Sequence, residues 1–208
     1  MTRLIGVYGA GGCGRGIMPL ARAEYLEAEL VFIDDGQAPG QMNGHDIVTW
    51  TDFLDYQADE KAVSIAIAAS HIRKILADRC ATANIQLIEA RAASVVELDE
   101  VVIEVGACLS PFVTLASNIR IGRCFHANLY SYVEHDCVIG DFVTFAPGVK
   151  VNGNVTIGDH AYIGSGAIVR QGLTIGAGAI VGMGAVVTHD VPPGITVIGN
   201  PARPLIKD

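Results

Sequence analysis

One histidine of this 208-residue chain stands between two acids. In the stretch Val133-Glu134-His135-Asp136-Cys137, a carboxylate flanks His135 on each side. A carboxylate bonded to one imidazole nitrogen fixes the tautomer and raises the basicity of the other nitrogen. Such a histidine can take the proton of an amine or hydroxyl that attacks a thioester. The sequence therefore predicts His135 as a general base beside Asp136 and Glu134. A solvated surface histidine among acids is the alternative.

A second chemical motif is rich in glycine and lies near the N-terminus. Gly9, Gly11 and Gly14 follow a strand-like stretch and precede a helical one, with the spacing G-x-G-x-x-G. Glycines in this context allow a tight turn and a close approach of phosphate oxygens to N–H groups at a helix N-terminus. Asp34 ends the next predicted strand, where a carboxylate can meet a ribose hydroxyl. We predict nucleotide binding here; the alternative is a glycine-rich turn with two solvated aspartates.

Alternating strand and helix signals surround this loop. They predict helices at 17–27 and 70–84, the second with Ser70 as its N-cap, and strands at 3–9, 30–33, 63–69 and 85–88, with a loop between the second and third strands. This order predicts a small parallel sheet with helices on its faces. Only about 90 residues precede the next domain, so one nucleotide or a nucleotide-linked sugar fits better than a dinucleotide.

The second half of the chain repeats every six residues. Apolar side chains recur without interruption at fifteen positions, and several of them are followed by glycine. A period of six fits neither a helix nor an ordinary strand, so it indicates a solenoid. Three hexads close a triangular coil of 18 residues, with the apolar side chain inside and glycine where a side chain is costly. The result is a parallel β-helix of about five coils whose inward residues are Ile103, Leu109, Leu115, Ile121, Ala127, Val133, Ile139, Phe145, Val151, Ile157, Ile163, Val169, Ile175, Val181 and Val187.

The bulk composition limits the partners and the compartment. A formal charge of −8 argues against nucleic acid and against an acidic membrane surface, which both select basic patches. No apolar stretch is long enough to span a bilayer, and the N-terminus lacks the layout of a signal peptide. The five cysteines have no C-x-x-C spacing, which is typical of reduced thiols. We therefore expect a cytoplasmic protein that inserts into no membrane and binds no nucleic acid.

Together these motifs resemble the bacterial nucleotide-sugar acyltransferases of the PglD/NeuD type. The resemblance rests on residues 8–14, 32–35, 65–67 and 133–142, which match in order and spacing. It implies an α/β Rossmann-like nucleotide-sugar-binding domain at 1–92, a left-handed parallel β-helix at 93–192 and a tail at 193–208. It further implies acetyl-CoA as the acyl donor, a nucleotide-linked sugar as the acceptor, and a homotrimer with active sites between subunits.

The resemblance also assigns residues to roles. His135 falls on the family's base, Asp136 on the acid that raises its basicity, and Asn128 on a polar active-site position. It places the nucleotide-sugar at Gly9, Gly11, Gly12, Cys13, Gly14, Asp34, Asp35 and Ala68. It places acetyl-CoA at Thr144, Gly153, Ser165 and Met183, mostly through the backbone. The end of the chain resembles that of many hexapeptide acyltransferases, so Arg203 is expected at a CoA phosphate, with a solvated tail as the alternative.

The chain departs from the family pattern at three places. Cys13 and Thr144 stand where the family often has histidine, and residues 68–70 replace a Gly-Asn-Asn run. Residues 18 apart stack in a triangular β-helix, so His126 is expected beside Thr144. We hypothesise that His126 partly replaces the missing contact to acetyl-CoA.

The most specific function that this reasoning predicts is N-acetylation of an amino-dideoxy sugar linked to UDP or dTDP. Two alternatives stay open: O-acetylation of a sugar hydroxyl, as in sialic-acid modification, and a non-catalytic trimeric scaffold that binds nucleotide sugars. A γ-type carbonic anhydrase needs three histidines on one zinc ion. No two solenoid histidines here are 18 or 36 residues apart, so no metal is expected.

Overall fold

The computed structural model describes residues 2–205 and shows two compact units. Of the described residues, the first unit comprises 2–91 and 106–108, and the second comprises 92–105 and 109–205. Within the described residues, no helix has both the length and the apolar character needed to cross a bilayer. The domain limits at 92 and 192 stay a prediction.

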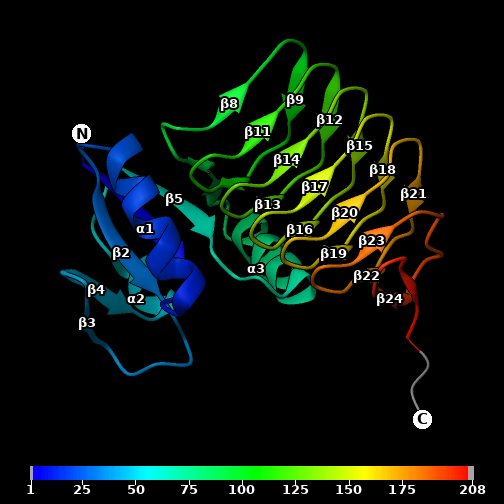
Figure 1. The fold of residues 1–208 in the computed structure, drawn as a ribbon. Coiled ribbons are helices and arrows are strands. Elements are labelled where there is room, and N and C mark those ends of the chain that lie inside the picture. The colour runs from blue at the N-terminus through cyan, green and yellow to red at the C-terminus, as the bar shows by residue number, and fades with distance from the viewer. Residues whose placement is uncertain (1, 206–208) are drawn as a thin grey trace. The chain divides into compact units, whose positions relative to one another are not determined.

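The first unit is built on a six-stranded sheet (Figure 1). In spatial order its strands are β3 (Gly40–Met42), β4 (His45–Val48), β2 (Glu29–Ile33), β1 (Arg3–Tyr8), β5 (Glu60–Ile65) and β6 (Gln86–Leu87). All neighbours pair in parallel except β3, which is antiparallel to β4. The helices are α1 (Gly12–Glu24), which contacts β1 and β2, the short α2 (Trp50–Asp55), and α3 (Ser70–Thr82), which contacts β5 and β6. The strand β7 (Ala90–Arg91) follows.

The strand order explains where a ligand can bind this unit. The chain proceeds from β1 to β2 on one side and then returns to place β5 on the other side of β1. In open parallel sheets, ligands bind beyond the carboxyl ends of the strands at the point where the order reverses. The loops after β1 and β5 therefore border the expected site.

Three sequence-based expectations for this unit were wrong in detail. Helix α1 begins at Gly12 rather than near residue 17, because glycines in its first turn weaken the helical pattern. The segment predicted as a loop contains β3, β4 and α2, with a tight turn at Asn43 and Gly44, both at positive φ, and a capping box between Thr49 and Asp52. The N-cap of α3 is Ala69 rather than Ser70, and no side chain caps that helix.

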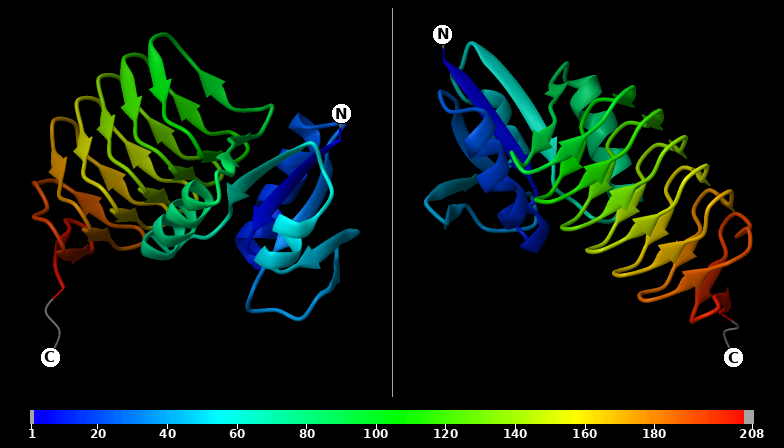
Figure 2. Two further views of the ribbon diagram at one scale, coloured as in Figure 1. Left: turned by 180° about the vertical axis from the view of Figure 1, so that it is seen from behind. Right: turned by 45° about the horizontal axis from the view of Figure 1, so that its top comes forward.

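The second unit is a triangular parallel β-helix of three sheets (Figure 2). Sheet I contains β10 (Cys108–Leu109), β13 (His126–Ala127), β16 (Thr144–Phe145), β19 (Tyr162–Ile163), β22 (Ile180–Val181), β24 (Thr196–Ile198) and β25 (Arg203–Pro204). Sheet II contains β8 (Val96–Glu97), β11 (Thr114–Leu115), β14 (Tyr132–Val133), β17 (Lys150–Val151), β20 (Ile168–Val169) and β23 (Val186–Val187). Sheet III contains β9 (Val101–Ile103), β12 (Ile119–Ile121), β15 (Val138–Ile139), β18 (Thr156–Ile157) and β21 (Thr174–Ile175).

The predicted hexad pattern is confirmed strand by strand. Each of β9 to β23 ends on one of the fifteen predicted inward residues, and all of these are buried except the partly buried Ile103. Parallel pairs join residues 18 apart, as in Val133 with Val151. Every coil therefore repeats the same three corners, and residues 18 apart form columns along the solenoid.

The glycines that follow the inward residues are needed for close stacking of the coils. A Cβ built on Gly140 would lie 2.7 Å from the backbone nitrogen of Asp159 in the next coil. The left-handed corner residue comes two positions later, and there non-glycine residues are frequent, including Asp136 (φ 59°) and His160 (φ 61°). A side chain at these glycine positions is therefore costly, as the sequence predicted. The cost comes from contact with the next coil rather than from a positive φ.

Candidate active site and nucleotide-binding loop

His135 and Asp136 lie at the corner between sheets II and III, directly after β14. The Nδ1 atom of His135 lies 2.8 Å from Asp136 Oδ2, and the His135 side chain is 55% exposed. Asp136 adopts the left-handed conformation and anchors the corner by donating its backbone N–H to Ser117. The left-handed turn lets adjacent side chains meet, which neighbours on a regular strand cannot do because they point to opposite faces.

The Asp136 carboxylate is held at both oxygens. Asn118 Nδ2 donates to Asp136 Oδ1 at 3.1 Å, while Oδ2 faces His135. Hydrogen bonds from His135 and then from Asn118 lower the pKa of the Asp136 carboxyl, so this carboxylate is ionised at neutral pH. An ionised carboxylate only accepts hydrogen bonds, so it selects the Nδ1–H tautomer and leaves Nε2 with a lone pair.

Gly153 lies one coil beyond His135 and makes room for its ring. A Cβ at residue 153 would lie 2.6 Å from His135 Cε1 and 2.7 Å from Nε2, closer than any real carbon contact. The imidazole therefore packs on the Gly153 backbone. The sequence predicted Gly153 as a donor contact and missed this packing, although the 18-residue period places the two residues in one column.

Glu134 and Asn128 are not joined to His135. Within the described residues, the His135 imidazole is hydrogen-bonded to Asp136 and not to Glu134. Burial, followed by the negative charge of Glu134, raises the pKa of Tyr132. Asn128 lies at the corner between sheets I and II, where its Oδ1 accepts from the N–H of Leu129. Their catalytic roles stay predictions.

The residues predicted to bind acetyl-CoA, other than Gly153, gather on sheet I and its edge. His126 and Thr144 are register partners of β13 and β16, which confirms that they stack, but their exposed fractions are only 6% and 5%. That burial favours a packing role for His126, and its contact to acetyl-CoA stays a prediction. Ser165 and Met183 are exposed and occupy one column at the corner between sheets I and II, and Arg203 is exposed on β25.

The glycine-rich loop between β1 and α1 has the geometry of a phosphate-binding turn. Gly9 has φ 106°, which L residues rarely adopt, and a Cβ at Gly14 would lie 1.7 Å from the Gly9 oxygen. A Cβ at Gly11 would meet nothing within 4 Å, so the N-terminal turn of α1 is open to a ligand. The first N–H groups of a helix attract anions.

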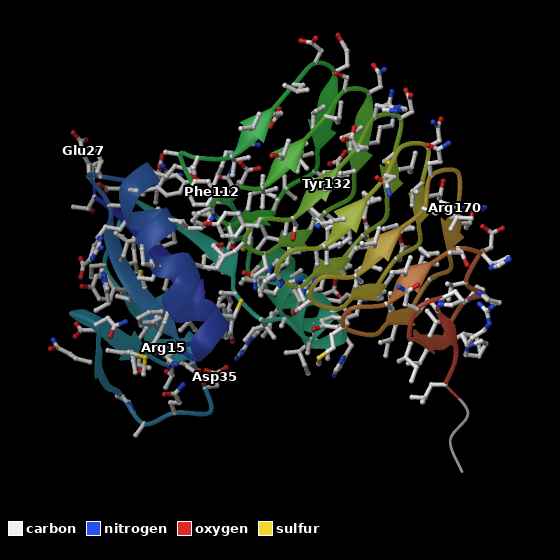
Figure 3. All side chains as sticks on the ribbon, viewed as in Figure 1. Arg15, Glu27, Asp35, Phe112, Tyr132 and Arg170 are labelled. Atoms are coloured by element: carbon white, nitrogen blue, oxygen red, sulfur yellow. The ribbon has the colours of Figure 1, made fainter. Side chains whose placement is uncertain are left out.

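Asp34 supports this loop from the end of β2. Its Oδ2 accepts from Ala10 N at 2.9 Å and from Gln37 Nε2 at 2.9 Å, and its Oδ1 accepts from Gly36 N at 3.0 Å. The sequence did not single out Arg15, whose guanidinium lies beside the loop, 3.5 Å from the Ala10 oxygen. Arg15 and Asp35 lie at the same end of the first unit (Figure 3).

Asp35 is occupied by groups of the protein itself. Its carboxylate accepts from Trp50 N at 2.8 Å and Tyr8 Oη at 2.8 Å, and it forms an ion pair with Arg79 at 2.6 Å. Trp50 stacks on Tyr8, and the Arg79 guanidinium lies over the Trp50 ring. Burial raises the pKa of the Asp35 carboxyl, but these hydrogen bonds and the Arg79 charge outweigh it and leave the pKa below its usual value.

We expect the Asp35→Asn variant to lose about 1 kcal/mol of unfolding free energy at pH 7, a modest value because the side chain is 43% exposed. Asp35 has a lower pKa in the folded state than in the unfolded chain, so its contribution is present above about pH 4 and is lost as pH falls through the folded value. Urea unfolding at pH 7 and pH 3 measures this, with the exposed Asp55→Asn as control. Equal losses at both pH values would contradict the assignment.

Cys13 and Ala68 lie near a buried arginine. Arg73 is fully buried and donates from Nη1 to the carbonyls of Ile67 and Ala68, which holds the loop after β5. Burial raises the pKa of the Cys13 thiol, an effect that the Arg73 charge partly offsets. Cys13 is therefore a neutral thiol at pH 7 and cannot supply the positive charge of a protonated histidine there.

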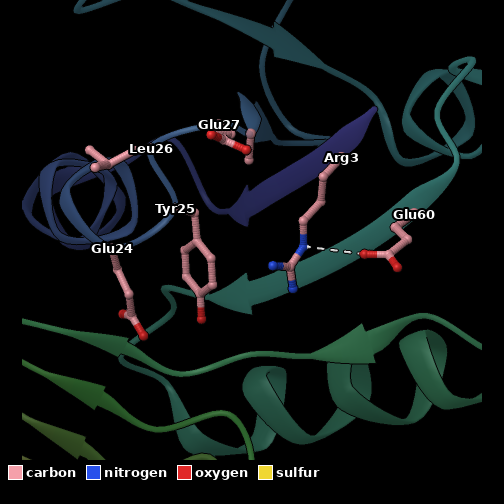
Figure 4. Close-up of a pocket in the computed structure, with 7 residues that line it drawn as sticks. Arg3, Glu24, Tyr25, Leu26, Glu27 and Glu60 are labelled. Atoms are coloured by element: carbon pink, nitrogen blue, oxygen red, sulfur yellow. Dashed lines mark ion pairs between the residues drawn. The ribbon is translucent and has the colours of Figure 1, made fainter. Parts of the chain in front are cut away.

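A separate concavity of about 480 Å³ lies at the amino end of the same sheet (Figure 4). It is lined by Arg3, Glu24, Tyr25, Leu26, Glu27, Ala28 and Glu60. None of the predicted site residues borders it, and nucleotides bind at the opposite, carboxyl end of such strands. Within residues 2–205, no three His, Cys, Asp or Glu side chains are grouped to hold a metal ion.

Two family models match the chain. The PglD N-terminal domain matches residues 4–80, and the bacterial transferase hexapeptide repeat matches residues 154–189. A GDP-perosamine N-acetyltransferase of Escherichia coli O157:H7 is 47% identical over 212 residues, which cover 97% of this chain and 96% of that protein.

Solved structures agree over nearly the full length of the chain. WeeI from Acinetobacter baumannii AYE is 52% identical with a TM-score of 0.96, covering 98% of this chain and 100% of that one. The acetyltransferase domain of PglB from Neisseria gonorrhoeae FA1090, in complex with acetyl coenzyme A, is 31% identical with a TM-score of 0.92, covering 99% and 100%. PerB from Caulobacter crescentus, in complex with CoA and GDP-perosamine, is 27% identical with a TM-score of 0.90, covering 97% of each chain. The predicted fold class is confirmed, and the chain belongs to the bacterial nucleotide-sugar acetyltransferases of the PglD/NeuD type.

Proposed function

We propose that this protein transfers the acetyl group of acetyl-CoA to the amino group of a GDP-linked amino-dideoxy sugar, with His135 as the general base. The observation that carries the proposal is the 2.8 Å hydrogen bond from His135 Nδ1 to the Asp136 carboxylate. It leaves Nε2 as the proton acceptor on a ring that is more than half exposed. The 47% identical relative supports the reaction class.

The nucleotide in this proposal differs from the one that the sequence suggested. UDP or dTDP was expected, whereas the Escherichia coli relative is named for GDP-perosamine and the Caulobacter crescentus structure contains it. A glycine-rich loop binds the diphosphate, which all these carriers share, so the motif could not separate them. GDP replaces UDP and dTDP in the proposal for this reason.

The reaction needs two proton transfers, to and from His135, and one exchange of bonds at the thioester carbon. His135 Nε2 takes a proton from the neutral sugar amine as its nitrogen attacks the carbonyl carbon of acetyl-CoA. A carbon–nitrogen bond forms, the carbon–sulfur bond breaks, and the imidazolium returns its proton to the CoA thiolate. Asp136 stabilises the positive charge that His135 carries in between. Backbone N–H groups of the coils stabilise the carbonyl oxyanion.

The sugar nucleotide is held at the other end by the loop between β1 and α1. The open turn at Gly11 and Gly12 receives the diphosphate, and Arg15 supplies a cation beside it. Asp34 holds the loop through Ala10 N and lies at the end of β2, where the ribose is expected. In the proposal Asp35 acts indirectly, because Arg79, Tyr8 and Trp50 already surround its carboxylate.

The proposal includes a homotrimer with active sites between subunits. In one solenoid, His135 and Gly153 occupy the corner between sheets II and III, whereas Ser165 and Met183 occupy the corner between sheets I and II. Acetyl-CoA bound along the corner between sheets I and II would be separated from His135 of the same chain by the width of sheet II. When a second copy packs against the corner between sheets II and III, His135 of one subunit comes close to the acetyl-CoA corner of the other. This arrangement favours a closed symmetric assembly.

We expect release of the CoA thiol with GDP-perosamine at a kcat/KM at least about tenfold above that with UDP- or dTDP-linked 4-amino-dideoxy sugars. Tenfold corresponds to about 1.4 kcal/mol, a discrimination that hydrogen bonds to one base supply. GDP-rhamnose, which has a hydroxyl in place of the 4-amino group, is the matched acceptor control and should stay inert. Faster turnover of GDP-rhamnose than of GDP-perosamine would support O-acetylation. No turnover of any of these sugars would support a non-catalytic scaffold that binds nucleotide sugars.

A further inference from the structure

Asn118 and Asp136 occupy consecutive positions of one corner column. They are 18 residues apart, both have left-handed backbones (φ 61° and 59°), and Asn118 Nδ2 lies 3.1 Å from Asp136 Oδ1. The second oxygen of that carboxylate, Oδ2, faces His135 Nδ1 at 2.8 Å. Three side chains therefore form one chain of hydrogen bonds, from Asn118 through Asp136 to His135.

The direction of each bond follows from the chemistry of the groups. An ionised carboxylate accepts hydrogen bonds and donates none, so the amide nitrogen of Asn118 must face Asp136. The Asp136 side chain is 47% exposed and is otherwise free to rotate into water. The Asn118 contact fixes one oxygen from the neighbouring coil, which holds the other oxygen in the plane that His135 Nδ1 requires.

We propose that Asn118 is a positioning residue for acetyl transfer, which holds the Asp136 carboxylate in the rotamer that orients His135. The inference rests on the proposed role of His135 as the base. Asn118 touches no reacting atom and acts only through Asp136. A carboxylate that orients the catalytic imidazole loses much of its effect when its geometry is not maintained.

The same column offers a matched control on the other side of Asp136. Asn154 lies one coil further along, is exposed, and has φ 57°, so it carries the same backbone cost as Asn118 when replaced by alanine. Its backbone N–H donates to the His135 carbonyl, as that of Asn118 donates to Asp99, but its side chain makes no hydrogen bond to Asp136. The charged groups of this column nearest to Asn118 are Asp136 itself and Glu100, one coil earlier.

The test compares Asn118→Ala and Asn118→Asp with Asn154→Ala in the full-length protein. Aspartate has the shape of asparagine and tolerates the left-handed conformation, but it cannot donate to Asp136 when ionised. We expect both Asn118 variants to lower kcat about five- to tenfold, with KM for acetyl-CoA and GDP-perosamine within twofold of wild type. Asn154→Ala should retain kcat within twofold.

A second readout reports on orientation without turnover. Nitrogen-15 NMR of the imidazoles distinguishes the Nδ1–H from the Nε2–H tautomer, and the His135 signal is assigned by its loss in His135→Asn. We expect mainly Nδ1–H in wild type and Asn154→Ala, and a shift toward Nε2–H in both Asn118 variants.

The outcomes separate this inference from the proposed function. Wild-type kcat and tautomer in both Asn118 variants would overturn the inference, as would an equal loss in Asn154→Ala. Retained turnover in His135→Asn, together with a changed tautomer in Asn118→Ala, would overturn the role of His135 as base and support the orientation by Asn118.

Discussion

The His135→Asn variant is expected to lower kcat with GDP-perosamine by about 10²- to 10⁴-fold, the usual contribution of a general base. Asparagine approximates the shape of the imidazole and its amide can still donate a hydrogen bond to Asp136, but it cannot take up a proton near neutral pH. KM for acetyl-CoA should change by less than about threefold, because the base acts on the acceptor amine. Thiol release under saturating substrates measures both parameters.

The matched control for this variant is His160→Asn. His160 also occupies a left-handed corner of the solenoid, at φ 61°, and its ring stacks on Phe142 with centroids 5.1 Å apart. It lies at the corner between sheets III and I, away from His135. We expect His160→Asn to keep kcat within about twofold even if it lowers Tm slightly. A loss of kcat below tenfold in His135→Asn would exclude His135 as the general base.

The solenoid could be predicted almost to the residue because its pattern is strictly local and repeated. Each inward position must be apolar, and one inserted residue would turn every later side chain outward, so an unbroken count fixes the register. The segment between β2 and β5 has no such repetition. Its hairpin depends on one Asn-Gly turn and its helix α2 on one capping box, and each signal is short enough to be taken for a loop.

The catalytic pair could be predicted because its two members are adjacent in the sequence. The contacts from Asn118 and Gly153 come from neighbouring coils, so they follow from the 18-residue period combined with side-chain geometry that no sequence pattern contains. For Asp35, the position in the sequence was misleading. Its position beside Asp34 suggested a direct contact to the nucleotide, but Arg79 and Trp50, far away in the sequence, already bind its carboxylate.

Gly153→Ala is expected to lower kcat about 10- to 100-fold while the fold stays intact. The added methyl group would lie 2.6–3.1 Å from three atoms of the His135 ring. His135 is 55% exposed, so its ring can turn outward at little cost, and the imidazole then leaves the position in which Asp136 orients it. A displacement of about 1 Å in a catalytic group is enough for an effect of this size.

Gly140→Ala provides the contrast. There the added methyl group would meet backbone atoms, 2.7 Å from Asp159 N and 3.0 Å from the Gly158 carbonyl carbon, and the backbone cannot move aside without separating two coils. We expect a fall in Tm of several degrees for Gly140→Ala and of less than about two degrees for Gly153→Ala, measured by thermal unfolding. Gly153 would then be needed for catalytic activity and Gly140 for stability, although both lie against the neighbouring coil.

A double-mutant cycle decides whether Gly153 acts through His135. If the glycine only makes room for the imidazole, Gly153→Ala should add less than about twofold to the loss already caused by His135→Asn, because two residues that serve one function are not additive. Gly153 was also predicted as a backbone contact for acetyl-CoA, and that role would raise KM for the donor in both backgrounds. Additive losses in kcat, with donor KM unchanged, would contradict both roles.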